Sequence, residues 1–166
     1  MTQLTSSQDF KVATLGHRSA PTCLSLAERT FGKESSKYKI VQNFMKEKRA
    51  GLVASIRGCV VGFIVYDNRN REKAEVLAFA VHKPDRRQGI GRLLMGKVAK
   101  WPRTEVSVKV DERNLAAQIF LRVQGFRATE IEHGSPEYYV FERGTVGIAS
   151  AASEVNTEPQ TVGAKQ

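Results

Sequence analysis

The sequence predicts an α/β (α+β) fold in which about four helices pack against one mixed central sheet of about seven strands. Three observations support this prediction. Segments with the two-residue apolar period of strands alternate with segments of helical period. One apolar strand runs directly into a glycine-containing turn that opens a helix. Finally, 166 residues that are 41% hydrophobic suffice for one domain core but not for two ordinary ones. We therefore expect one domain at residues 1–143.

The first half of the chain is predicted to contain a strand, two amphipathic helices and a hairpin. Gly32 and Gly51 are each placed to end a helix. Arg57 and Gly58 have the form of a two-residue hairpin turn between two apolar runs. The expected elements, in order, are a strand at 9–15, helices at 20–31 and 36–48, and strands at 52–56 and 59–66.

The second half is predicted to alternate strands with helices and to end in a second hairpin. Pro102 stops the first helix of this half, and Asn114 is placed to cap the second, which Gly125 ends. The apolar stripe expected to be buried on that second helix consists of Ala116, Ile119, Phe120 and Val123. The expected elements, in order, are a strand at 72–82, a helix at 89–101, a strand at 105–110, a helix at 114–125, and strands at 126–132 and 137–143.

Composition limits the possible partners. The net charge is +9, but the basic residues are spread over the chain and form no single run, so nucleic-acid binding is not expected. Neither a leader nor an apolar run of membrane-spanning length is found, so we expect a cytoplasmic protein, monomeric or homodimeric, without a membrane partner. Cys23 and Cys59 are expected to be buried free thiols, and the isolated histidines predict no metal site. Residues 144–166 lose all periodicity and are expected to form a flexible tail, with partial helix near 148–155.

The segment at residues 74–92 predicts an anion-binding turn. Backbone N–H groups at a helix start are unpaired and lie at the positive end of the helix dipole, and Gly89 and Gly91 would let a phosphate approach closely. A dinucleotide-binding turn would need a third glycine where Leu94 stands, and no Gly-Lys-Ser/Thr motif is present. The cations that surround the turn are Arg86, Arg87 and Arg92.

The spacing Arg86-x-x-Gly89-x-Gly91, directly after an apolar strand, resembles the coenzyme A pyrophosphate motif of the GNAT family of N-acetyltransferases. A downstream segment from Asn114 to Phe126 is similar to the family's second conserved segment, and the resemblance covers residues 9–143. It implies a sheet that splays after its fourth strand and acetyl-CoA as the co-substrate. The residues that it implies for coenzyme A binding are Phe79, Ala80, Val81, Arg86, Arg87, Gln88, Gly89, Ile90, Gly91, Arg92, Asn114, Ala117 and Leu121.

The resemblance also implies direct transfer of acetyl from the thioester to a primary amine, either a small molecule or a protein amino group. The backbone N–H of Val81 is the implied donor to the carbonyl oxygen as it becomes negative. Glu75 is the implied base, because Ala74-Glu75-Val76 resembles the catalytic glutamate segment of the histone-acetylating branch. The alternative for Glu75 is an ordinary solvent-facing glutamate on a strand.

Two positions depart from the pattern of the family. Leu121 stands where many members have a tyrosine that protonates the leaving sulfur, and leucine has no proton to donate. Lys109 stands where the ribosomal-protein alanine acetyltransferase branch has a glutamate that acts as the base. This branch is otherwise the most similar in pattern. These departures keep open a second function, a non-catalytic acyl-CoA-binding or regulatory module on the same fold.

Overall fold

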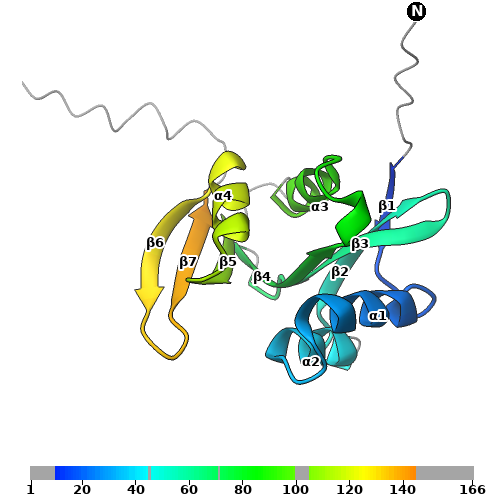
Figure 1. The fold of residues 1–166 in the computed structure, drawn as a ribbon, viewed down its shortest axis with the longest axis horizontal. Coiled ribbons are helices and arrows are strands. Elements are labelled where there is room, and N and C mark those ends of the chain that lie inside the picture. Colours follow the sequence, from blue (N-terminus) through cyan, green and yellow to red (C-terminus); the bar gives the residue numbers. More distant parts are fainter. Residues whose placement is uncertain (1–9, 45, 71, 100–104, 145–166) are drawn as a thin grey trace, which may run out of the picture.

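The computed structural model describes residues 10–44, 46–70, 72–99 and 105–144 (Figure 1). Within them, seven strands form one sheet in the order β1-β2-β3-β4-β5-β7-β6, and only β4 and β5 pair in parallel. The strands are β1 (Phe10–Thr14), β2 (Ala50–Ile56), β3 (Cys59–Asp67), β4 (Lys73–Val81), β5 (Glu105–Asp111), β6 (Arg127–Glu132) and β7 (Tyr138–Arg143). The helices are α1 (Ala20–Phe31), α2 (Ser36–Asn43), α3 (Ile90–Ala99) and α4 (Leu115–Val123), with a short 3₁₀ helix η1 (Lys83–Asp85).

Helices cover both faces of the sheet, and each face has its own apolar core (Figure 1). Helices α1 and α2 pack on the side where Cys23, Phe63 and Ala80 belong to one buried cluster. Helices α3 and α4 lie on the other side, where Leu94 and Leu121 belong to a second cluster. This arrangement confirms the predicted mixed α/β fold.

A β-bulge at Leu77 divides β4 into two halves. In the register with β3, Val65 lies opposite Ala78 but Tyr66 lies opposite Val76, so Leu77 is an extra residue. Side chains alternate between faces along a strand, and Val76 and Ala78 would therefore share a face without the bulge. Instead, Val76 belongs to the core under α3 and α4, whereas Ala78 belongs to the core under α1 and α2.

Strands β4 and β5 separate after a short paired stretch (Figure 1). Their pairing ends at Val76 and Val108, whereas β4 continues to Val81 and β5 continues to Asp111. The second half of β4 therefore has a strand neighbour on the β3 side alone. This opening confirms the predicted splay after the fourth strand.

Helix α2 is shorter than predicted, and Gly51 does not end it. The helix ends at Asn43, and the chain then reverses through a turn in which Lys48 has a φ of 52°. Gly51 lies in β2, where a Cβ atom would be 2.8 Å from the side chain of Leu15. The glycine is therefore explained by a close approach between chain segments.

The stripe predicted for α4 was wrong. Ile119 and Val123 are 63% and 77% exposed, and the residues of α4 that are buried are Gln118 and Leu121. The amide of Gln118 donates to the carbonyl of Glu112 at 2.7 Å, which satisfies a polar side chain on the buried face. Because this bond fixes the rotation of the helix, apolar residues of the predicted stripe turn toward solvent.

The cysteine prediction holds for one residue of the two. Cys23 is a buried free thiol, and burial raises its pKa to about 12. Cys59 is exposed at the start of β3, so the prediction was wrong there. Apolar neighbours alone do not show whether a residue beside a hairpin turn faces the core.

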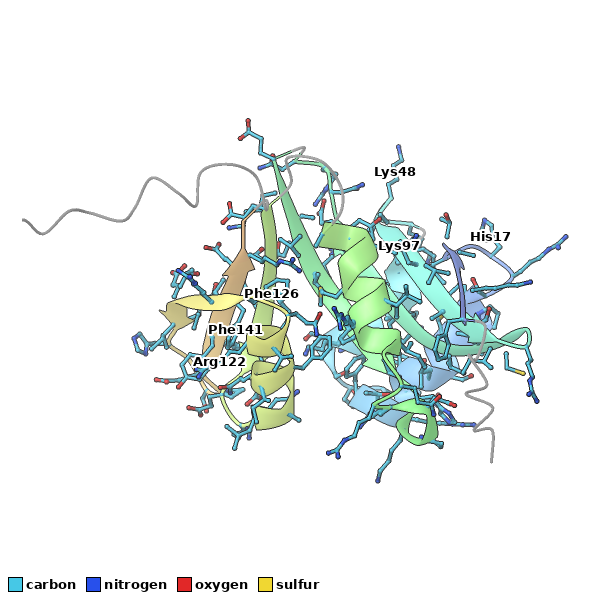
Figure 2. All side chains as sticks on the ribbon, turned by 90° about the horizontal axis from the view of Figure 1, so that it is seen from above. His17, Lys48, Lys97, Arg122, Phe126 and Phe141 are labelled. Atoms are coloured by element: carbon cyan, nitrogen blue, oxygen red, sulfur yellow. The ribbon has the colours of Figure 1, made fainter. Side chains whose placement is uncertain are left out.

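The side chains of the whole molecule show how core and charge are distributed (Figure 2). Phe126 and Phe141 are buried together in the core under α3 and α4. Lys48 lies in the turn before β2, Lys97 lies on α3 and Arg122 lies on α4 (Figure 2). No helix among the described residues has the length and apolar character that crossing a membrane requires. Trp101 and residues 145–166 of the predicted tail lie outside the described residues.

Candidate functional site

The turn before α3 has the geometry of an anion site. Gly89 has a φ of 86°, a conformation that favours glycine. The first backbone bond into the helix runs from the N–H of Leu93 to the carbonyl of Gly89 at 2.9 Å, so the N–H groups of residues 90–92 have no partner within the helix. Free N–H groups and the helix dipole together suit the pyrophosphate of coenzyme A.

The predicted residues of this turn divide into exposed and anchoring groups. Arg87, Gln88 and Arg92 are exposed at the turn. Ile90 is buried and fixes the start of α3 in the core. Arg86 instead turns back toward β4, where its Nε donates to the carbonyl of Val81 at 3.0 Å.

An aromatic pair lies beside the turn; Phe79 was predicted to bind coenzyme A, whereas Phe120 had no predicted role in binding. The rings of Phe79 on β4 and Phe120 on α4 stack with centroids 5.7 Å apart. A Cβ atom on Gly91 would lie 3.1 Å from Phe79 and 3.2 Å from Phe120. Gly91 therefore lets the start of α3 approach the two rings. Phe120 was expected as one residue of a buried stripe, and the sequence carried no signal that it would face β4.

The register of β3 with β4 decides which peptide groups of β4 are free. The N–H of His82 donates to the carbonyl of Val61 at 2.7 Å. Because hydrogen-bonded pairs alternate along antiparallel strands, the peptide groups of Ala80 also point toward β3. Those of Phe79 and Val81 point toward the opening. The peptide groups of Phe79 and the N–H of Val81 are thus available to pair with the amides of a pantetheine arm, whereas the Val81 carbonyl accepts from Arg86 and Ala80 is turned away.

Glu75 and Val81 are too far apart to act on one acetyl group. Glu75 lies opposite Asp67 and Val81 opposite Gly62, five residues apart on β3, and a rise of about 3.3 Å per residue separates the two positions by roughly 17 Å. The free N–H closer to Glu75 is that of Phe79, which points toward the opening. The two assignments implied by the resemblance cannot hold together, and Phe79 replaces Val81 as the candidate oxyanion donor.

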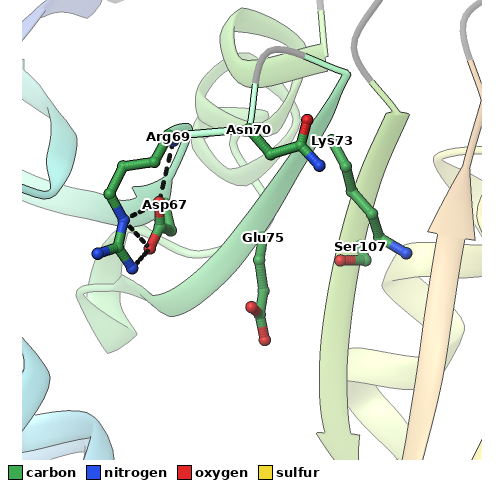
Figure 3. A pocket seen from close by; sticks show the side chains of 6 residues that line it. All are labelled: Asp67, Arg69, Asn70, Lys73, Glu75 and Ser107. Atoms are coloured by element: carbon green, nitrogen blue, oxygen red, sulfur yellow. Dashed lines mark hydrogen bonds and ion pairs between the residues drawn. The ribbon is translucent and has the colours of Figure 1, made fainter.

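Glu75 lies in a polar pocket on the face of the sheet opposite α3 (Figure 3). It pairs with Ser107 of β5 one position before the strands separate. Ser107 is only 5% exposed, and no hydrogen bond of its hydroxyl to another described residue is found. The pocket has a volume of about 310 Å³ and is lined by Asp67, Arg69, Asn70, Lys73, Glu75 and Ser107.

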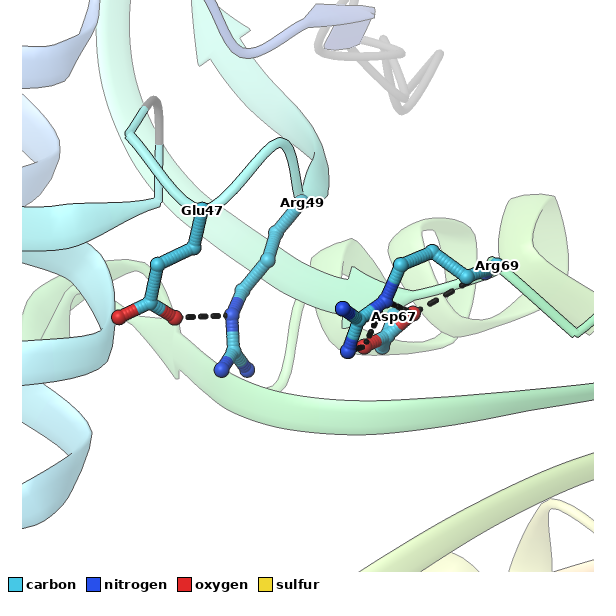
Figure 4. Close-up of polar contacts among 4 residues, drawn as sticks. All are labelled: Glu47, Arg49, Asp67 and Arg69. Atoms are coloured by element: carbon cyan, nitrogen blue, oxygen red, sulfur yellow. Dashed lines mark hydrogen bonds and ion pairs between the residues drawn. The ribbon is translucent and has the colours of Figure 1, made fainter.

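Most of the charged side chains around this pocket form ion pairs. Asp67 accepts hydrogen bonds from Arg69, which hold the pKa of its carboxyl below the usual value, and Arg49 next to it pairs with Glu47 at 2.6 Å (Figure 4). No ion pair or hydrogen bond of the Glu75 carboxylate is found within the described residues. Glu75 is therefore the pocket's unpaired carboxylate.

Two lysines lie near Glu75, and each has its own carboxylate partner. Lys73 pairs with Glu142, and Lys109 pairs with Glu132 at 2.8 Å. These partners raise the pKa of both lysines, and Glu75 contributes a further small rise. Lys109 thus holds its proton and cannot act as the base that the family often has at this position.

The predicted residues of α4 lie where a structural role explains them. The side chain of Asn114 accepts a hydrogen bond from the N–H of Ala117 at 3.1 Å and so caps the helix. Leu121 is 2% exposed in the core. Asn114 thus fixes the start of α4, and Leu121 anchors the helix in the core.

Comparison with known proteins gives a family and a fold. The model of the acetyltransferase (GNAT) family matches residues 20–126. No curated protein sequence matches the chain.

Several solved structures have a similar fold. Ard1 from Thermoplasma volcanium is 23% identical with a TM-score of 0.71, and the match covers 83% of this chain and 99% of that one. The ribosomal-protein-S18-alanine N-acetyltransferase of Escherichia coli is 16% identical with a TM-score of 0.72, over 86% and 97% of the two chains. Arabidopsis thaliana NAA60, in complex with acetyl-CoA, is 15% identical with a TM-score of 0.72, over 84% and 100%.

Proposed function

The chain belongs to the acetyltransferase (GNAT) family, and from that membership we propose that it transfers acetyl from acetyl-CoA to a primary amine by direct attack. The observation that carries the proposal is the opening between β4 and β5. The anion turn lies toward one end of this opening, and Glu75 lies at the other end, where the two strands begin to separate. A coenzyme A arm extended along the opening would join the two sites.

The backbone would hold the coenzyme. The N–H groups at the start of α3 would bind the pyrophosphate, with Arg87 and Arg92 as neighbouring cations. The free peptide groups of Phe79 and the free N–H of Val81 would pair with the pantetheine arm. The N–H of Phe79 would then donate to the carbonyl oxygen as it becomes negative.

Glu75 would prepare the acceptor. An amine attacks only when it is neutral, so the ammonium form must first lose a proton, and the Glu75 carboxylate would take it directly or through one water. The nitrogen then bonds to the carbonyl carbon, the carbon–sulfur bond breaks, and the nitrogen releases its second proton to water. A thiol pKa near 8.5 allows the sulfur to leave as thiolate and take its proton from water, without the tyrosine that Leu121 replaces.

Coenzyme A release with a panel of primary amines tests this function. We expect turnover by the natural protein and about a hundredfold lower turnover at neutral pH for Glu75→Gln, with unchanged affinity for acetyl-CoA. Higher pH should partly restore the variant, because more of the amine is then neutral. Glu28→Gln, which alters an exposed pair with Lys33, is the control.

The alternative function, a non-catalytic acyl-CoA-binding module, is favoured by Leu121, which has no proton to donate, and by Lys109, which is protonated and cannot act as a base. Tight binding of acetyl-CoA without turnover of any amine would support that module and reject transfer. Absence of acetyl-CoA binding would reject both.

A further inference from the structure

We propose that the polar pocket beside Glu75 receives the acceptor as a primary ammonium group on a short, hydrophilic alkyl chain, with Ser107 as a positioning residue. This inference rests on the proposed function and names its substrate class. It depends on three features of the pocket: the hydroxyl of Ser107, the charge balance, and the polarity of the lining.

The hydroxyl of Ser107 faces the pocket. The residue as a whole is 5% exposed, yet it lines the pocket and is directed from β5 toward the space beside β4 (Figure 3). A serine hydroxyl can both donate and accept hydrogen bonds. A ligand in the pocket with an N–H group would donate to this oxygen.

The charge balance selects a cation. Lys73 is surrounded by the carboxylates of Glu142, Glu105 and Glu75. Lys109 is surrounded by those of Glu132, Glu75 and Glu130. The ion pairs Asp67–Arg69, Lys73–Glu142 and Lys109–Glu132 are already formed, which leaves the Glu75 carboxylate without a cation of its own among the described residues. An ammonium group of the acceptor would pair with Glu75.

The lining of the pocket disfavours amines that carry an apolar chain. All six side chains around the pocket are polar or charged. An aromatic or long aliphatic amine would desolvate these groups without forming hydrogen bonds. An ammonium group donates three hydrogen bonds, and Glu75 and Ser107 supply two acceptors on neighbouring strands.

The position of the pocket brings such an ammonium to the reacting atoms. Glu75 and Ser107 form the pair directly before the last paired residues of β4 and β5. An amine held there lies where the two strands begin to separate, at the end of the opening that would contain the thioester. Ser107 then orients the nitrogen while Glu75 removes its proton.

Binding of ethanolamine and 1,3-diaminopropane, followed by NMR titration of the full chain with coenzyme A present, tests the inference. We expect both amines to shift the resonances of Glu75 and Ser107 and 2-phenylethylamine to do so much more weakly. Ser107→Ala should weaken diamine binding about tenfold or more, because a hydrogen bond to a charged group is lost. Ser107→Thr, which keeps the hydroxyl, should restore most of it, and Ser55→Ala on β2 should change nothing.

In the turnover assay, Ser107→Ala should raise the KM for the amine by a similar factor and leave the KM for acetyl-CoA unchanged. Equal binding by Ser107→Ala and the natural protein would overturn the inference. So would a preference for phenylethylamine, or for a peptide α-amino group over the short amines. Amine binding at these residues without any turnover would instead reject the proposed function and leave the pocket assignment standing.

Discussion

Gly91→Ala and Gly96→Ala place the same methyl group on helix α3 in opposite surroundings. In a helix interior, alanine is more favourable than glycine by about 0.8–1 kcal/mol. A Cβ at position 96 meets no atom within 4 Å. Gly96→Ala should therefore stabilise the protein by up to about 1 kcal/mol, which corresponds to roughly 2–4 °C in Tm for a chain of this size.

At position 91, the same methyl group would press against Phe79 and Phe120 at 3.1–3.3 Å. Inserting a methyl group into a packed site costs about 1–3 kcal/mol, which offsets or exceeds the gain in helix propensity. Gly91→Ala should thus leave the free energy of unfolding unchanged or lower it by up to about 2 kcal/mol. Urea unfolding followed by circular dichroism measures both variants.

A double-mutant cycle isolates the contact. In a Phe120→Leu background, part of the aromatic obstacle is gone, and Gly91→Ala should recover a large part of the gain seen at position 96. If Gly91→Ala stabilised the natural protein as much as Gly96→Ala does, the close packing of α3 on the aromatic pair would be refuted.

Two further predictions concern α4 and the end of β5. Leu121→Ala should cost about 2–5 kcal/mol and Ile119→Ala less than about 0.5 kcal/mol, because the first is buried and the second is 63% exposed; equal losses in urea unfolding would contradict the observed rotation of α4. Arg113 holds the pKa of Asp111 at about 2, so Arg113→Gln should return it toward 3.8 in an NMR titration. Because the pKa of Asp111 is lowered in the folded state, the pair stabilises the protein above pH 3.8, and this contribution is lost as the pH falls toward 2. An unchanged Asp111 titration in the variant would show that a group other than Arg113 lowers this pKa.

The order of the elements could be predicted from the sequence because each has a local signal. Valines at every second position predicted β5, and glycines predicted turns that are formed by a few neighbouring residues. The anion turn was predictable for the same reason, since Gly89 and the start of α3 are neighbours in the chain. The end of α2 was predicted less well, because Gly51 serves a contact with Leu15, which is distant in sequence.

The acceptor side of the site could not be predicted in the same way. Ser107 is one serine in an alternating strand, and its importance comes from the register of β5 with β4, which no local pattern encodes. The rotation of α4 depends on one hydrogen bond from Gln118 to a backbone carbonyl. Val81 was assigned by analogy with the family, and only the length of β4 shows that it lies too far from Glu75.

The bulge at Leu77 also constrains how the length of β4 can vary. If Leu77 instead paired with β3 and the strand ran without a bulge, Phe79 would turn toward α1 and α2, and Ala78 would turn toward α3 and α4. The side chains of Glu75 and Phe79 would then share one face, and the contact between Phe79 and Phe120 would be lost. Single substitutions in the acceptor pocket do not shift this alternation. Exchange of side chains on β4 therefore keeps both faces as they are, and loss of Leu77 itself would do the same, because Val76 and Ala78 already lie on opposite faces.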